Sequence, residues 1–138
     1  MRIAEPIDAE LFAAAKAAGE MAYAPYSGFK VGVALLADDG KIYTGINVEN
    51  ASYPVANCAE ASAIAAMLAG GGKRIRRLYV TGPGKAPVTP CGACRQRIRE
   101  FGDPETVIVS HGLDGDPLHA TLESLLPHSF GPEYLEPR

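Results

Sequence analysis

The chain of 138 residues has the length of one ordinary domain, so we expect residues 1–138 to form a single domain. Its composition, 47% hydrophobic and 21% charged, is typical of globular proteins and excludes a disordered or fibrous chain. The net charge of -3 excludes a general attraction to nucleic acid. The sequence lacks the roughly twenty-residue apolar stretch of a membrane span, and its N-terminus is acidic where a signal peptide would be apolar. We therefore expect a cytoplasmic protein with no nucleic-acid or membrane partner.

The first third of the chain predicts a helix followed by a β-hairpin. Apolar residues recur at helical spacing between residues 11 and 22, with Asp8 as the expected N-cap. Two β-rich segments follow, at residues 29–37 and 41–46. The Asp-Gly pair at residues 39–40 tolerates the positive φ angles of a tight turn and joins the two segments.

The remainder predicts helices alternating with strands. After an irregular segment, residue 58 opens a helix that three glycines stop, and we expect the basic run at residues 73–77 to be a solvated connection. The further elements are a strand at 77–82, a helix at 91–101, a strand at 106–110 and a short helix at 122–126 before an irregular tail. The pattern predicts an α/β fold with three layers, α/β/α, around a mixed central sheet of about five strands.

The three cysteines share one local setting. Cys58, Cys91 and Cys94 each lie where an extended or irregular segment enters the first turn of a predicted helix. Free N–H groups and the positive end of the helix dipole favour thiolate at such positions. An odd number of cysteines argues against a disulfide framework and leaves metal binding, redox chemistry or burial. Two helices with adjacent N-termini would present three thiolates to one cation, and zinc takes such ligands in tetrahedral geometry.

A fourth protein ligand for zinc is not obvious, because all three histidines lie far downstream. Three protein ligands and one open position form the arrangement of a catalytic zinc site. Glu60 follows Cys58 by two residues in the same helical turn. Its carboxylate is separate from the ligand positions, so it is a candidate general base and general acid.

Cys-x-Glu followed downstream by Pro-Cys-x-x-Cys is typical of the zinc-dependent nucleobase deaminases. Five segments extend this likeness along the chain, in the order "YAPYSGFKVGVALL", "TGINVENASY", "NCAEASAI", "PCGACRQ" and "LLPHSFGPEYL". In these segments the chain resembles the short, homotetrameric cytidine deaminases.

The resemblance implies hydrolytic deamination of cytidine and 2′-deoxycytidine to the uridine nucleosides, with release of ammonia, in pyrimidine salvage. It implies one zinc ion per subunit, with Glu60 shuttling protons, and a homotetramer with shared active sites. The ligands that it implies are Cys58, Cys91 and Cys94.

The substrate contacts are implied by the same resemblance. Asn47 and Glu49 would hold the sugar hydroxyls, and Phe29 would pack against the pyrimidine. The backbone at Ala59 would recognise the base, and Phe130 would come from a neighbouring subunit. Because a carboxylate accepts hydrogen bonds from hydroxyls but repels phosphate, Glu49 predicts a preference for nucleosides over nucleotides.

The sequence departs from the family directly after Glu60. Members with three cysteine ligands usually carry an arginine at that position, which offsets the excess negative charge of the thiolates, and here it is Ala61. We expect Arg95, which follows Cys94, to carry more of this compensation.

Other interpretations of the same residues remain open. Instead of binding zinc, the cysteines could be unrelated small buried residues, and the Cys-x-x-Cys pair could be a thioredoxin-like redox centre. A deaminase of the same fold acting on another substrate, and a zinc protein without catalytic activity, are the alternative functions. Replacement of Glu60 would leave the role of a non-catalytic zinc protein intact.

Overall fold

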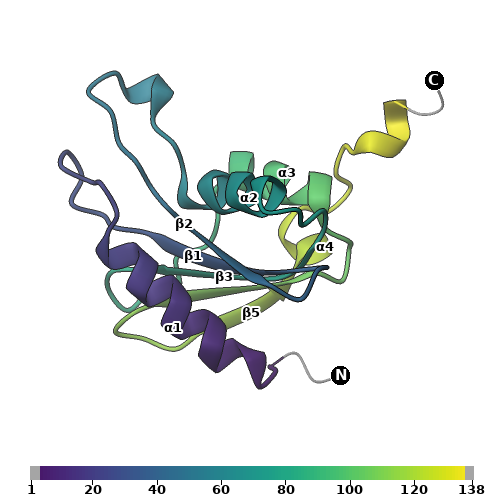
Figure 1. Ribbon diagram of the computed structural model, residues 1–138, viewed down its shortest axis with the longest axis horizontal. Coiled ribbons are helices and arrows are strands. Elements are labelled where there is room, and N and C mark those ends of the chain that lie inside the picture. Colours follow the sequence, from purple (N-terminus) through teal and green to yellow (C-terminus); the bar gives the residue numbers. More distant parts are fainter. Residues whose placement is uncertain (1–3, 136–138) are drawn as a thin grey trace.

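The computed structural model describes residues 4–135, in which helices alternate with the strands of a sheet (Figure 1). Short 3-10 turns lie at Tyr53–Val55 and Pro132–Leu135. None of the helices in this range has the length and apolar character needed to cross a bilayer. The elements in chain order are α1 (Ile7–Glu20), β1 (Gly32–Ala37), β2 (Ile42–Ile46), α2 (Ala59–Ala69), β3 (Ile75–Gly82), α3 (Gly92–Phe101), β4 (Val107–Gly112), β5 (Leu118–Thr121) and α4 (Leu122–Leu125).

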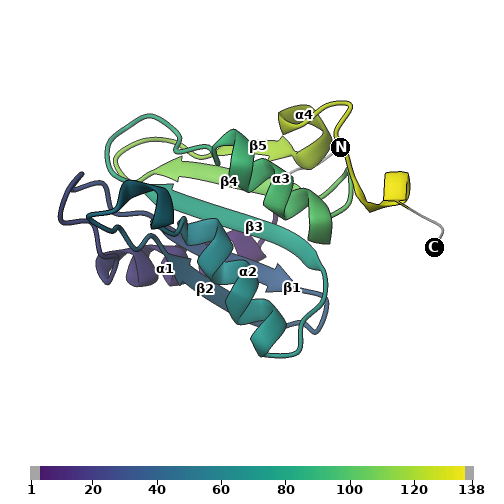
Figure 2. The same ribbon diagram turned by 90° about the horizontal axis from the view of Figure 1, so that it is seen from above.

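The five-stranded sheet is mixed, with the strand order β2-β1-β3-β4-β5. The neighbours β3 and β4 are parallel and are connected through α3, whereas the other neighbouring pairs are antiparallel. Helix α1 covers one face of the sheet, and α2 and α3 lie side by side on the other (Figures 1 and 2). The three-layer α/β/α arrangement predicted from the sequence is therefore confirmed.

Four strands lie near their predicted positions, and the fifth, β5, comes from a segment for which the sequence analysis predicted no element. Gly40 makes the expected hairpin turn with a φ of +81°. Strand β5 pairs antiparallel with β4 at the edge of the sheet. Its four residues alternate between apolar and polar, but they are few and follow Pro117 directly, so they give only a weak strand signal. Pairing with β4 thus supplies what the local propensity of β5 does not.

The start of α1 differs from the prediction that Asp8 caps it. The helix begins at Ile7 with Pro6 in the N-cap position, and no side chain caps it. Asp8 lies inside the first turn, where its carboxylate pairs with Arg77 of β3 at 2.6 Å and with Nε2 of His119 in β5 at 3.1 Å. The carboxylate makes these tertiary contacts, and the fixed φ of proline starts the helix without a side-chain cap.

The basic run at residues 73–77 is not the solvated connection that the sequence suggests. Strand β3 begins inside it, and the side chains of Ile75 and Arg77 are buried. Arg74 pairs with Asp103 at 2.8 Å, next to the start of β4. Arg77 and Arg74 therefore take part in the packing and ion pairing of the fold instead of facing only solvent.

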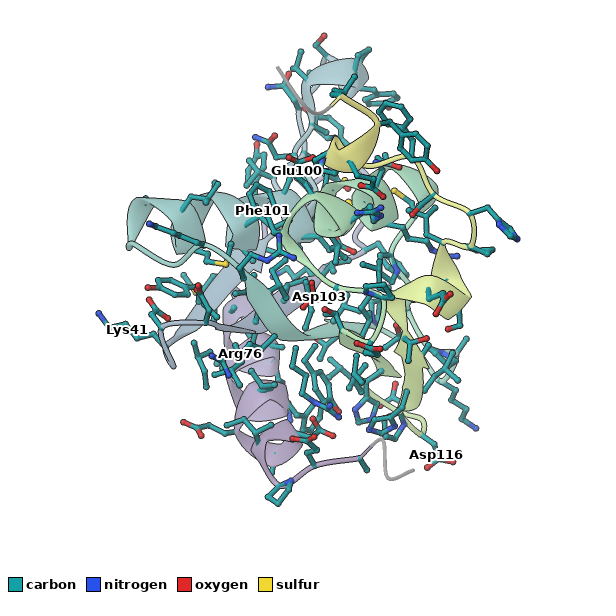
Figure 3. All side chains as sticks on the ribbon, turned by 90° about the vertical axis from the view of Figure 1, so that its right-hand side faces the viewer. Lys41, Arg76, Glu100, Phe101, Asp103 and Asp116 are labelled. Atoms are coloured by element: carbon teal, nitrogen blue, oxygen red, sulfur yellow. The ribbon has the colours of Figure 1, made fainter. Side chains whose placement is uncertain are left out.

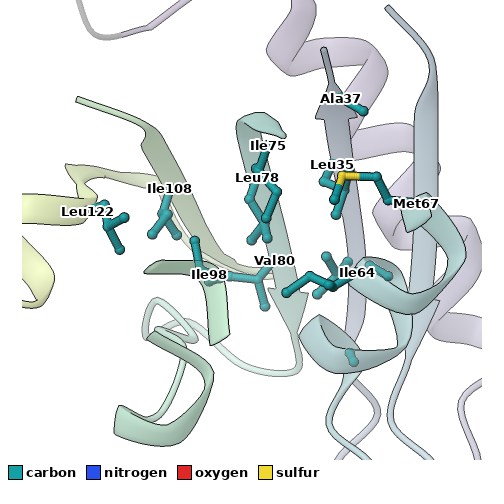
Figure 4. Packing of buried hydrophobic residues seen from close by; sticks show 13 residues of the cluster. Leu35, Ala37, Ile64, Met67, Ile75, Leu78, Val80, Ile98, Ile108 and Leu122 are labelled. Carbon is teal, nitrogen blue, oxygen red and sulfur yellow. The ribbon is translucent and has the colours of Figure 1, made fainter. Parts of the chain in front are cut away.

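Two apolar layers lie on the two faces of the sheet. The smaller one, under α1, contains Leu11, Ala15, Ala34, Tyr79 and Val109. The larger one joins the sheet to α2 and α3 and contains Ile64, Met67, Leu78, Val80, Ile98 and Ile108 among its buried members (Figure 4). This larger layer holds α2 and α3 against the sheet and so sets where their N-termini lie.

A glycine in β2 sets how closely α2 approaches the sheet. A Cβ atom on Gly45 would come within 2.3 Å of both the carbonyl oxygen of Ala59 and the backbone nitrogen of Ala63. Contacts this short do not occur between real atoms, so only glycine allows this approach. Gly45 thereby brings the first turn of α2 down onto the sheet.

Candidate active site

The N-termini of α2 and α3 bring the three cysteines together. Cys58 is the N-cap of α2, Cys91 is the N-cap of α3, and Cys94 lies in the first turn of α3. All three are free thiols, and their Sγ atoms lie within 4.8 Å of one another. The clustering that the sequence predicted is therefore present in the structure.

This cluster fits a zinc ion by its donor set. Zinc–sulfur bonds of about 2.3 Å in a tetrahedron place neighbouring sulfurs roughly 3.8 Å apart, which is compatible with sulfurs that all lie within 4.8 Å of one another. Cys94 is buried, Cys58 is half-buried and Cys91 is exposed. The cluster thus has an inner side formed by protein and an outer side toward solvent, which leaves room for a further ligand.

Glu60 lies beside the cysteine cluster with only 6% of its surface exposed. Burial raises the pKa of its carboxyl above the ordinary value, while hydrogen bonds from its own backbone N–H and from Cys94, and the charge of Arg97, limit the rise. A carboxyl in such a place exchanges protons more readily near neutral pH than a solvated one does. The geometry therefore suits the proton-transfer role predicted for it.

Arg95, which we expected to compensate the charge of the thiolates, makes its hydrogen bonds elsewhere. Its Nε donates to the carbonyl oxygen of Pro90 and its Nη1 to that of Leu125, each at 2.8 Å. Instead, Nη1 of Arg97 donates to Sγ of Cys94 at 3.3 Å. Residues three apart share one face of a helix, whereas adjacent residues do not, so the spacing between Cys94 and Arg97 was the signal that the sequence analysis missed.

The segment with Asn47 and Glu49 lies next to the approach to Cys58. Val48 and Asn57 exchange two backbone hydrogen bonds of 2.9 Å each. On its other side, the same segment pairs with Tyr23, through bonds between Tyr23 and Asn47 and between Glu49 and Tyr23. These bonds fix the predicted sugar-binding residues relative to the start of α2.

Asn47 holds the backbone on both sides of Lys30. Its Oδ1 accepts a hydrogen bond from the N–H of Val31, and its Nδ2 donates to the carbonyl oxygen of Phe29, both at 2.8 Å. Phe29 itself is 43% exposed. Asn47 therefore positions the segment that carries Phe29, a structural role that the sequence analysis did not foresee.

Glu49 accepts hydrogen bonds from the loop that follows α1. The donors are the N–H of Tyr26 at 2.9 Å, the N–H of Ser27 at 3.1 Å and the hydroxyl of Ser27. These bonds, with the Ser27 hydroxyl contributing most, hold the pKa of Glu49 below its ordinary value, so it is an anion at neutral pH. Ser27, which the sequence analysis did not single out, thus orients the predicted sugar contact.

A hollow of about 370 Å³ opens beside this carboxylate. Ordinary small-molecule sites begin at about this size and combine apolar walls with a few polar groups. The lining residues are Tyr26, Ser27, Glu49, Asn50, Tyr53 and Ala56.

The last two predicted contacts lie in contrasting places. Ala59 is buried between Cys58 and Glu60 at the start of α2. Phe130 is 58% exposed, and its ring stacks on Tyr134 with centroids 5.2 Å apart. The C-terminal stretch and the segment between β2 and α2 lie on opposite sides of the α2–α3 pair (Figures 1 and 2). The C-terminal stretch that carries Phe130 lies against α3, where Nε2 of Gln96 donates to the carbonyl oxygen of Phe130 at 2.9 Å.

Comparison with known proteins gives consistent matches over most of the chain. A family model described as "Cytidine and deoxycytidylate deaminase zinc-binding region" matches residues 6–110. A cytidine deaminase of Sporosarcina psychrophila is 44% identical over 126 residues, which cover 91% of this chain and 93% of the relative.

Solved structures agree. The crystal structure of cytidine deaminase from Burkholderia pseudomallei has a TM-score of 0.84 and 47% identity, covering 88% of this chain and 98% of that one. The structure of cytidine deaminase from Mycobacterium tuberculosis has a TM-score of 0.80 and 38% identity, covering 92% and 99%. With its zinc-compatible cysteine cluster, its fold and these matches, the chain belongs to the cytidine and deoxycytidylate deaminase family.

Proposed function

We propose that this protein is a zinc-dependent cytidine deaminase that converts cytidine and 2′-deoxycytidine to uridine and 2′-deoxyuridine with release of ammonia. The observation that carries the proposal is a buried Glu60 carboxyl beside three converging sulfurs. Zinc held by Cys58, Cys91 and Cys94 supplies a Lewis acid that makes water a nucleophile at neutral pH.

Glu60 moves the protons of this reaction. The C–O bond forms and the C–N bond breaks at the ring carbon that carries the exocyclic amine. Glu60 takes one proton from the attacking water and delivers it to the ring nitrogen of the base. It then takes the second proton from the newly formed hydroxyl and delivers it to the amine, which leaves as ammonia. Burial of Glu60 keeps bulk water from competing for these protons, and the backbone at Ala59 meets the base between Cys58 and Glu60.

Recognition of the sugar falls to Asn47 and Glu49, and Phe29 packs against the pyrimidine ring. Three donors already orient the Glu49 carboxylate, and a carboxylate has about four acceptor positions, so one position remains for a ribose hydroxyl. Its negative charge disfavours a phosphate at the same place. The substrates are therefore free nucleosides rather than nucleotides or nucleic acid.

The active form is a homotetramer in which Phe130 completes the site of a neighbouring subunit. Support comes from the position of the C-terminal stretch, on the opposite side of α2 and α3 from the segment that carries Glu49. The enzyme acts in pyrimidine salvage in the cytoplasm, a reducing compartment that suits three free thiols.

The proposal is tested by incubating purified, zinc-replete protein with cytidine and following the formation of uridine and ammonia. The matched variant Glu60→Gln keeps the shape of the side chain but removes its proton exchange. We expect conversion by the wild type and a loss of at least about a thousandfold in kcat for the variant. If zinc-loaded wild-type protein converts neither cytidine nor 2′-deoxycytidine, the proposed substrate is wrong. If Glu60→Gln keeps full activity, the proposed role of Glu60 is wrong.

A further inference from the structure

Arg97 is the basic residue that the structure places on the cysteine cluster. It lies on α3, one turn beyond Cys94, and its Nη1 donates to Sγ of Cys94 at 3.3 Å. Within residues 4–135, this is the hydrogen bond that joins a cationic side chain to one of the three sulfurs. Arg95 donates to two carbonyl groups instead.

A positive charge at this position would offset the negative charge of the zinc-loaded cysteine cluster. Three thiolates around a divalent zinc ion leave an excess negative charge, and the buried carboxyl of Glu60 lies beside it. A fixed positive charge beside the cluster offsets the excess negative charge of the zinc-bound form and thereby stabilises it. A hydrogen bond to a ligating sulfur also restricts the orientation of that ligand.

Position 61, where related proteins usually carry the compensating arginine, lies next to Arg97. Ala61, directly after Glu60 on α2, and Arg97 on α3 line the same groove of about 430 Å³ between the two helices. The small side chain of Ala61 leaves this groove open, so the guanidinium of Arg97 can extend back along α3 to Cys94. A longer side chain at position 61 would enter the same space.

We propose that Arg97 supplies, from α3, the positive charge that stabilises the zinc-loaded cysteine cluster, and that Ala61 leaves the space for it. Arg97 is a positioning residue that acts through Cys94 and does not touch the substrate. Because the side chain of Arg97 reaches the cluster from an exposed position, its effect is at the low end of the range for residues that support metal ligands. The inference rests on the proposed zinc site.

The test compares zinc affinity, measured by competition with a chromophoric chelator, among variants of the full chain. Arg97→Met removes the charge and the donor but keeps most of the side-chain length, and Arg97→Lys keeps the charge. Ala61→Arg combined with Arg97→Met returns an arginine to the groove from α2. Arg76→Met is the matched control, because Arg76 is an exposed arginine on β3, away from α3 and its residues Glu100 and Phe101 (Figure 3).

We expect Arg97→Met to weaken zinc binding about tenfold, Arg97→Lys to weaken it less, and the double variant to recover wild-type affinity within about threefold. In cobalt-substituted protein, Arg97→Met should also shift the thiolate-to-cobalt charge-transfer band, which a purely structural role would not move. The thermal midpoint reports folding separately. Unchanged zinc affinity in Arg97→Met, or no recovery in the double variant, would overturn the role of Arg97. Wild-type protein that binds no zinc would overturn the proposed site itself.

Discussion

Ser27 and Glu49 show how a single hydroxyl organises the proposed sugar contact. The Ser27 hydroxyl donates to Glu49 and accepts from the N–H of Phe29 at 2.9 Å. One side chain therefore links the carboxylate proposed to bind the sugar with the aromatic residue proposed to pack against the base. The exposed loop has few apolar contacts to fix it otherwise, so these hydrogen bonds determine its shape.

Ser27→Ala should therefore raise the KM for cytidine about tenfold and leave kcat within about threefold. The reason is that this hydrogen bond orients the proposed substrate contact without entering the chemistry. Steady-state kinetics check it, with Ser27→Thr, which keeps the hydroxyl, retaining most of the affinity. Ser52→Ala is the control in a neighbouring loop. A KM equal to that of the wild type would show that the loop does not depend on Ser27.

At the scale of elements, α1 is attached to the sheet by charge as well as by apolar packing. Asp8 in its first turn contacts Arg77 of β3 and His119 of β5, and the Arg77 and Asp8 side chains are largely buried. Burial alone would raise the pKa of Asp8, but hydrogen bonds from Arg77, from the N–H of Glu5 and from His119 outweigh it and hold that pKa below 3.8. This cluster joins one helix to two strands.

The stability that Asp8 contributes should depend on pH in a defined direction. A carboxyl whose pKa is lowered by folding stabilises the protein above its unfolded-state pKa, near 3.8, and this contribution is lost as the pH falls through the lower folded-state value. We expect Asp8→Asn to lower the free energy of unfolding by about 2 kcal/mol at pH 7 and by clearly less at pH 3.

Urea unfolding at the two pH values measures this difference. Glu10→Gln, which changes the other acidic residue in the first turn of α1, should have little effect at either pH because Glu10 is exposed. An equal loss of stability for Asp8→Asn at pH 7 and at pH 3 would contradict the assignment.

At the scale of the whole molecule, the two parts of the proposed substrate pocket lie apart. The cysteine cluster and Glu60 lie at the N-termini of α2 and α3. The C-terminal stretch and the segment between β2 and α2 lie on opposite sides of these helices. A closed symmetric assembly brings such separated parts together between subunits. The exposed aromatic rings of Phe29, Tyr53, Phe130 and Tyr134 are available for such contacts.

Shared sites can be tested by complementation. Glu60→Gln lacks the proton carrier and Phe130→Ala lacks the contributed ring, so each variant alone should be strongly impaired. Co-expressed in equal amounts, they should recover up to about a quarter of wild-type activity, because half of the subunits carry Glu60 and half of their neighbours carry Phe130. Activity no higher than the average of the two variants, or sedimentation of an active monomer, would refute sharing.

The parts of the fold and site that could be predicted from sequence are those that depend on local signals. The cysteines at helix starts, Glu60 beside Cys58, and the hairpin at Gly40 all follow from spacing within a few residues. Asp8 was misassigned because its partner, Arg77, lies 69 residues away, and β5 was missed because only its pairing with β4 makes it a strand.

The closeness of the three sulfurs also determines how the protein responds to oxidation when the metal is absent. Thiols this close to one another become oxidation partners once the metal is removed, and Cys91, exposed to solvent, is the first within reach of an oxidant. Because their number is odd, a disulfide between any two leaves one behind, and a disulfide that joins Cys58 to α3 would lock the two helices together. Protein stripped by chelators and kept in air should therefore lose its capacity to be reloaded, whereas the zinc-loaded form is protected by its own cofactor.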